Sequence, residues 1–136
     1  MTWSQRLLSV AFITTGILHF LRPESYEQII PDYLPLHHEI VLLSGAAEIA
    51  GGVAVAFERT RPAAGISLAV LLVLVFPANV NMAVHSERFA SIAPALLWAR
   101  LPLQALLIWW AIRATRPRRG PDRSAEVADR PFLPQA

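Results

Sequence analysis

Five polar side chains within long apolar stretches are the residues of this chain best placed to do chemistry. Three of them carry or can carry a charge and two are amides: His19, Glu48, Arg100, Asn79 and Gln104. An ionisable side chain in the hydrocarbon of a membrane is costly, so it is expected to face the protein interior and to have a function there. We therefore take these five side chains as the candidate ligand-binding site.

Glu48 is the most informative of the five. Small residues lie three or four positions away from it, at Ser44, Gly51 and Gly52, and such a helix face permits close packing of helices. A charged carboxylate that faced lipid would cost about 2.5 to 3.5 kcal/mol. We therefore expect Glu48 to point inward and to pair with Arg100.

Each candidate also has a purely structural interpretation. The expected pair of Glu48 and Arg100 would serve equally well to fix the register of two helices. His19 would contact headgroups at the membrane surface, and Asn79 and Gln104 would hydrogen-bond between helices. His37 and His38 lie next to each other, but neighbouring helical residues point about 100° apart and no third ligand is evident, so we expect no metal site.

Composition places the chain in a membrane. Of its 136 residues 54% are hydrophobic and 16% are charged, and the mean hydropathy is +0.43, which is too apolar for an ordinary soluble domain. The chain has no cysteine, which excludes thiolate catalysis and cysteine-ligated metal centres within it. Any redox function would therefore depend on a redox centre supplied from elsewhere.

Hydropathy predicts an all-α fold, a four-helix transmembrane bundle. Spanning helices need roughly 20 apolar residues each, and four windows meet this requirement, at residues 3–21, 38–57, 62–84 and 92–112. A short interfacial helix that begins at Pro23 is expected between the first two spans. The membrane domain then comprises residues 1–115, and residues 116–136 read as a basic, disordered tail.

The arginines predict the orientation in the membrane. All 12 basic residues are arginine, and half of them lie beyond residue 112. With four spans both termini share one side, and the positive-inside rule places that side in the cytoplasm of a bacterial inner membrane. The tail is expected to contact anionic lipid headgroups and not nucleic acid, because it has no aromatic stacking pattern and is interrupted by acidic residues. Counted from the opposite end of each helix, the five polar side chains lie roughly 3 to 18 Å deep.

Several short motifs resemble those of the DoxX-like membrane proteins, in the group that also holds MauE-like proteins. They are His19 to Glu24, Pro31 to Pro35, Ser44 to Gly52, Phe76 to Asn79 and Arg100 to Gln104. The resemblance covers roughly Leu7 to Arg113. It implies a four-helix inner-membrane protein, with His19, Glu48, Asn79, Arg100 and Gln104 at the motif positions, and relatives that are subunits of quinone-linked oxidoreductases.

Three functions follow from this pattern. The first is a non-catalytic accessory subunit or quinone-binding partner of a membrane redox complex, in which Arg100, Gln104 and His19 donate hydrogen bonds to a quinone. The second is a small proton-coupled carrier in which Glu48 is alternately protonated and paired with Arg100. The third is a structural or assembly scaffold whose polar layer only locks the bundle. No intrinsic cofactor is expected beyond a possible quinone.

Overall fold

The computed structural model describes residues 1–117, and every regular element in that range is a helix. The elements are α1 (Trp3–Leu21), α2 (Pro23–Glu27), α3 (His37–Ala56), α4 (Arg61–Val84), the 3-10 helix η1 (Ser86–Phe89) and α5 (Pro94–Thr115). The four long helices agree with the predicted windows to within three residues at each end. Nearly all of the predicted tail, from residue 118, lies outside the described residues.

Local chemistry sets the ends of α1 and the start of α2. Thr2 and Gln5 form a capping box: Gln5 N donates to Thr2 Oγ1 at 3.3 Å, and Thr2 N donates to Gln5 Oε1 at 2.9 Å. Pro23 ends α1, because the residue before a proline is disfavoured in the helical region. The same proline then occupies the first turn of α2, where no backbone donor is needed. A short helix beginning at Pro23 was predicted and is present.

Two side chains close the tight turn between α3 and α4. Thr60 Oγ1 donates to the Ala54 carbonyl at 2.7 Å, and Arg61 Nε donates to the Val55 carbonyl at 2.8 Å. These carbonyls belong to the last turn of α3, where the regular backbone hydrogen bonds of the helix come to an end. Arg61 also brings its positive charge to the negative end of the helix. The end of α3 is therefore capped from the start of α4.

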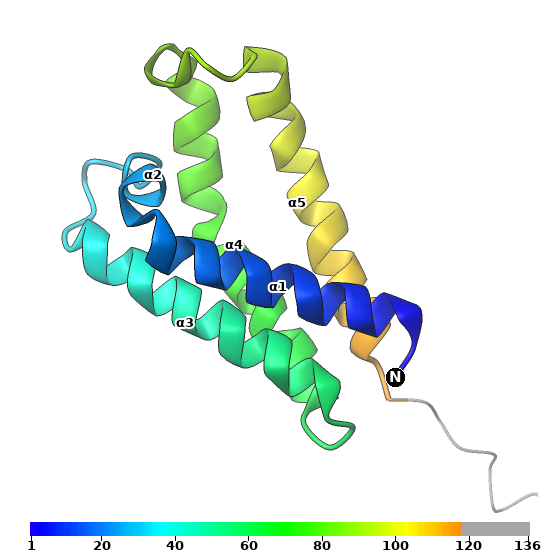
Figure 1. Cartoon of the computed structure of the whole chain (residues 1–136). Helices are drawn as coiled ribbons and strands as arrows, with labels where there is room; N and C mark the ends of the chain where they lie inside the picture. The colour runs from blue at the N-terminus through cyan, green and yellow to red at the C-terminus, as the bar shows by residue number, and fades with distance from the viewer. Residues whose placement is uncertain (118–136) are drawn as a thin grey trace, which may run out of the picture.

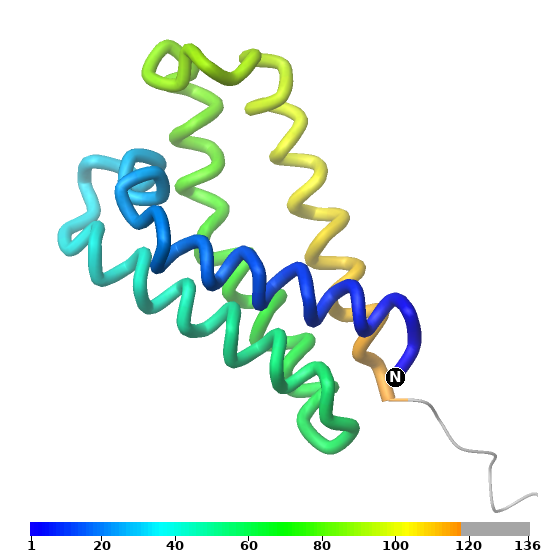
Figure 2. Tube along the Cα trace, in the orientation of Figure 1, coloured from blue at the N-terminus to red at the C-terminus, as the bar shows by residue number. Residues whose placement is uncertain are grey.

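The helices form two hairpins that cross each other (Figure 1). We call the antiparallel pair α1 and α3 the first hairpin, and α4 and α5 the second hairpin. The hairpins meet mainly through α3 and α4, whereas α1 and α5 approach each other at one end and then diverge (Figure 2). At that end, Gln5 Nε2 donates to the Ala114 carbonyl at 2.9 Å and Trp110 Nε1 donates to Ser4 Oγ at 2.7 Å.

Glycines allow the two helices of the first hairpin to touch. A Cβ atom on Gly16 would lie 2.6 Å from the Gly45 carbonyl oxygen, and one on Gly45 would lie 2.6 Å from His19 Cβ. Real side chains do not approach so closely, so only glycine fits at both positions. Gly45 therefore determines how near His19 comes to α3.

Three helices, α3, α4 and α5, are long and apolar enough to cross a membrane. The first predicted span, α1, is not among them, because it carries several polar residues. Three of these, Gln5, Ser9 and His19, are buried against the rest of the protein. Its exposed surface is largely apolar, with large side chains at Leu7, Val10, Ile17, Leu18 and Leu21, although Arg6 and three hydroxyl side chains are exposed as well.

Candidate functional site

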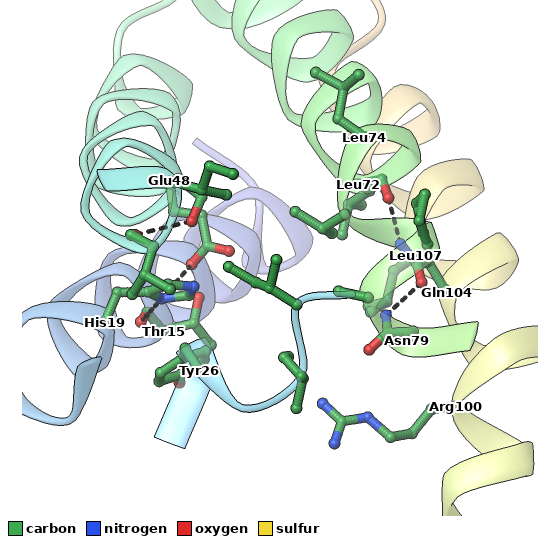
Figure 3. A pocket seen from close by; sticks show the side chains of 18 of the residues that line it. Thr15, His19, Tyr26, Glu48, Leu72, Leu74, Asn79, Arg100, Gln104 and Leu107 are labelled. Carbon is green, nitrogen blue, oxygen red and sulfur yellow. Dashed lines mark hydrogen bonds and ion pairs between the residues drawn. The ribbon is translucent and has the colours of Figure 1, made fainter. Parts of the chain in front are cut away.

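The five predicted site residues line a single cavity between the two hairpins. Its volume is about 360 Å³, and α1, the α2 segment, α3, α4 and α5 all contribute to its lining. His19 and Glu48 lie on one wall, and Asn79, Gln104 and Arg100 lie on the opposite wall (Figure 3). Most of the remaining lining is apolar and includes Phe12, Leu72, Leu103, Leu107 and Trp110. The structure thus brings all five to one space without placing them all in contact.

On the first-hairpin wall, the His19 ring is oriented by α1 itself. Its Nδ1 lies 2.8 Å from the Thr15 carbonyl oxygen, and because a carbonyl only accepts, the ring proton must be on Nδ1. The same Nδ1 lies 3.8 Å from Glu48 Oε2, which is too long for a hydrogen bond. Glu48 Oε2 is buried and has no hydrogen-bond partner among the described residues.

Tyr26 is part of this wall and was not predicted as a site residue. Its ring stacks on His19 with centroids 3.8 Å apart and planes inclined by 24°. Burial raises the pKa of the Tyr26 hydroxyl above its ordinary value, Glu48 raises it further, and Arg100 lowers it. The hydroxyl is therefore neutral and can both donate and accept. Tyr26 reaches this wall because the chain turns back toward His19 after Pro23.

On the second-hairpin wall, two amides are oriented by a backbone carbonyl. Gln104, which is only 2% exposed, donates through Nε2 to the carbonyl of Leu72 on α4. Its Oε1 must then be the acceptor for Asn79 Nδ2, at 2.5 Å. Asn79 Oδ1 is consequently turned away from Gln104 and toward the cavity (Figure 3). The predicted interhelical hydrogen bonding of these amides is present.

Arg100 does not pair with Glu48, so this prediction was wrong. Arg100 is an exposed residue, and its Nη1 contacts Met82 Sδ at 3.5 Å. Glu48 belongs to the first hairpin and Arg100 to the second, with the cavity between them. Counting residues along each helix gave the two side chains a similar depth. Because the hairpins cross, similar depth along the two helices does not bring the side chains together.

The histidines outside the cavity form no metal centre in the described range. His38 Nδ1 lies 2.6 Å from Glu27 Oε1 at an exposed position. Within residues 1–117 no group of three or more His, Asp or Glu side chains is arranged to hold a metal ion. Arg88 and Asp32, 3.2 Å apart, link η1 to the segment after α2. This ion pair and the His38–Glu27 contact help to hold the connection that covers one end of the cavity.

A protein-family model, described as "Domain of unknown function (DUF8561)", matches residues 8–115. The chain belongs to the DUF8561 family. The matched segment contains all five predicted site residues and Tyr26, and it extends from α1 to the end of α5. The two hydrogen bonds between α1 and α5 involve Ser4 and Gln5, which lie just before the matched segment. No curated protein and no solved structure matches the chain.

Proposed function

We propose that this DUF8561 protein is a four-span protein of the bacterial inner membrane, with both termini in the cytoplasm. The apolar character of α3, α4 and α5 supports the proposal. On α1, three polar side chains are buried and several large apolar ones are exposed, which supports a fourth span, because a helix in lipid has no water for its polar groups. The arginine distribution supports the orientation.

We further propose that the cavity binds a lipid-soluble small molecule of the quinone class. The observation that carries this proposal is that the five polar side chains line one largely apolar cavity of about 360 Å³. Ligand sites are typically cavities of about 300 to 1,000 Å³ with apolar walls and a few polar groups that fix orientation. A planar ring with polar substituents and an apolar tail has the shape and polarity of this space.

The chain then acts as a non-catalytic partner of a membrane redox complex, of the DoxX-like kind. It has no cysteine with which to hold an iron–sulfur cluster or to exchange electrons itself. Its own residues bind and orient the ligand: the apolar walls exclude water, and the polar groups at the two walls hold the head group. A partner protein supplies the redox centre.

Copurification tests this proposal. The full chain is extracted from native membranes in mild detergent, and the lipids that travel with it are identified by mass spectrometry. We expect a quinone-class molecule in near-stoichiometric amount. In the Ala78→Trp variant, which fills the cavity from α4, the ligand should be lost. The Ala63→Trp variant has the new side chain on an exposed part of the same helix and should retain it. Equal retention in both variants would contradict the cavity as the binding site.

One observation favours a second function, that of a scaffold. The amide chain from Leu72 through Gln104 to Asn79 joins α4 to α5, and such a link would serve to lock the second hairpin alone. In that case, the Ala78→Trp variant should still recover the same partner proteins in a pull-down, and no small molecule should copurify with the parent chain. A proton-coupled carrier is the remaining alternative, supported if proteoliposomes show flux that Glu48→Gln abolishes.

A further inference from the structure

The donors that would hold the carbonyl groups of a quinone are largely occupied. His19 Nδ1–H donates a hydrogen bond to the Thr15 carbonyl, and Gln104 Nε2 donates one to the Leu72 carbonyl. Each of these donors is already engaged by a backbone carbonyl, so a ligand that used it would have to break an existing hydrogen bond. Of the three donors expected from the sequence, only the Arg100 guanidinium is still largely free.

Residues with hydrogen-bond acceptors, in contrast, line the cavity on both walls. Glu48 is 9% exposed, and its buried Oε2 has no hydrogen-bond partner in the described part of the chain. A carboxyl group accepts hydrogen bonds through its oxygens, and leaving a buried one unpaired is costly. Across the cavity, Asn79 Oδ1 is held toward the open space by the amide chain (Figure 3). Two acceptors therefore lie on opposite sides of the same space.

We propose that the cavity selects a head group that donates hydrogen bonds from two opposite edges, as the two hydroxyls of a quinol do, over the corresponding dione. One hydroxyl donates to Glu48 and the other to Asn79 Oδ1. This inference rests on the proposed function and specifies that the ligand is bound in its reduced, quinol form. A dione has no hydroxyl proton to donate to Glu48 or to Asn79 Oδ1.

The charged groups and the aromatic surfaces of the cavity further restrict the kind of head group that fits. A carboxyl group, Glu48, and a guanidinium group, Arg100, stand on opposite walls of the cavity (Figure 3). An ammonium or a carboxylate would be suited to one wall only, so this arrangement favours an uncharged polar head group. Phe12, Tyr26 and Trp110 give the lining flat aromatic surfaces, which favour a ring over the glycerol head of a lipid.

A binding titration of the full chain in nanodiscs tests the inference. The probes are decylubiquinol, decylubiquinone, the dimethyl ether of decylubiquinol and monodecanoylglycerol, under anaerobic conditions. The readout is the half-saturating concentration from tryptophan fluorescence, since Trp110 lines the cavity. We expect decylubiquinol to bind at least about tenfold more tightly than the quinone or the ether, because both lack the hydroxyl protons. The glycerol lipid should bind more weakly than the quinol.

The outcomes separate this inference from the proposed function. Equal binding of quinol, quinone and ether would overturn the inferred preference for a head group that donates hydrogen bonds, while leaving the cavity a quinone site. Binding of none of these ring compounds would overturn both. Monodecanoylglycerol that binds as tightly as the quinol would assign the site to a lipid head group and overturn the ring assignment. The comparison of quinol with its ether uses the unaltered chain, so it does not depend on any variant folding.

A variant adds a second, independent comparison. Glu48→Gln replaces an acceptor by an amide that can also donate, so the preference for quinol over quinone should fall by about tenfold. The matched control is Glu39→Gln, which makes the same change at an exposed position on α3 that does not line the cavity. The control should keep the parent preference. An unchanged preference in folded Glu48→Gln would overturn the assignment of the donor contact to Glu48.

Discussion

The carbonyl of Leu72 determines the orientation of the Asn79 amide, because the side chain of Gln104 connects the two. A carbonyl can only accept, so it fixes the Gln104 amide, and Gln104 in turn fixes Asn79. Sequence reasoning identified both amides from the cost of burying polar groups in apolar helices. It could not predict which atom each amide would present to the cavity, because that depends on a contact between α4 and α5.

Replacing Gln104 should therefore affect both stability and binding. We expect Gln104→Leu to lower the free energy of unfolding by about 0.6 to 1.7 kcal/mol, since hydrogen bonds between membrane helices are of this size. Unfolding in mixed micelles measures the change. Gln28→Leu is the matched control, because Gln28 is exposed, and its effect should be within about 0.5 kcal/mol. A loss in the control as large as that in Gln104→Leu would contradict the role of the amide chain.

The separation of Glu48 from Arg100 gives a second prediction at this scale. Residues that do not touch contribute independently to stability. In a double-mutant cycle of Glu48→Gln and Arg100→Gln, we expect a coupling energy below about 0.5 kcal/mol. The His19→Gln and Glu48→Gln cycle should show a larger coupling, because Nδ1 and Oε2 are 3.8 Å apart. A strong Glu48–Arg100 coupling would mean that the two side chains meet across the cavity.

The helices themselves were largely predictable. Long apolar windows, proline positions and the capping residues of α1 are local features, so the sequence located each long helix closely. The contribution of the α2 segment to the site was harder to foresee. Tyr26 stacks on His19 only because the chain folds back after Pro23, and periodicity says nothing about the direction of such a turn.

At the scale of helix packing, Gly45 should be sensitive to a single added carbon. Gly45→Ala would place a Cβ atom 2.6 Å from His19 Cβ and force α1 away from α3. Overpacking of this kind costs about 1 to 3 kcal/mol, and it should also weaken ligand binding by displacing His19. Ala46→Val adds volume at an exposed position of the same helix and should have little effect. Thermal unfolding in detergent, followed by circular dichroism, makes the comparison.

For the molecule as a whole, the sequence predicted the class of the fold but not how its halves are arranged. Hydropathy suggested four parallel or antiparallel spans around one polar layer. The structure has two hairpins that cross, with a cavity where the layer was expected. Crossing angles arise from side chains interlocking between helices that are distant in sequence, and no local pattern in the chain reports them.

The proposed topology can be tested with single cysteines, since the chain has none of its own. Glu87→Cys lies beyond α4 in η1, and Glu58→Cys lies in the turn before α4. Both positions are exposed. In intact spheroplasts we expect a membrane-impermeant thiol reagent to label the first variant, and to label the second only after lysis. Labelling of both before lysis would contradict a transmembrane α4.

The two hydrogen bonds between α1 and α5, at Ser4 and Gln5, join these helices at one end only. The 19 residues of α1 give it a length of roughly 28 Å, and α1 and α5 diverge along it (Figure 2). The hairpins are held together mainly by α3 and α4, on another side of the cavity. We therefore expect a flat ligand to enter from the acyl chains between the diverging parts of α1 and α5, where no contact that joins the hairpins has to be broken.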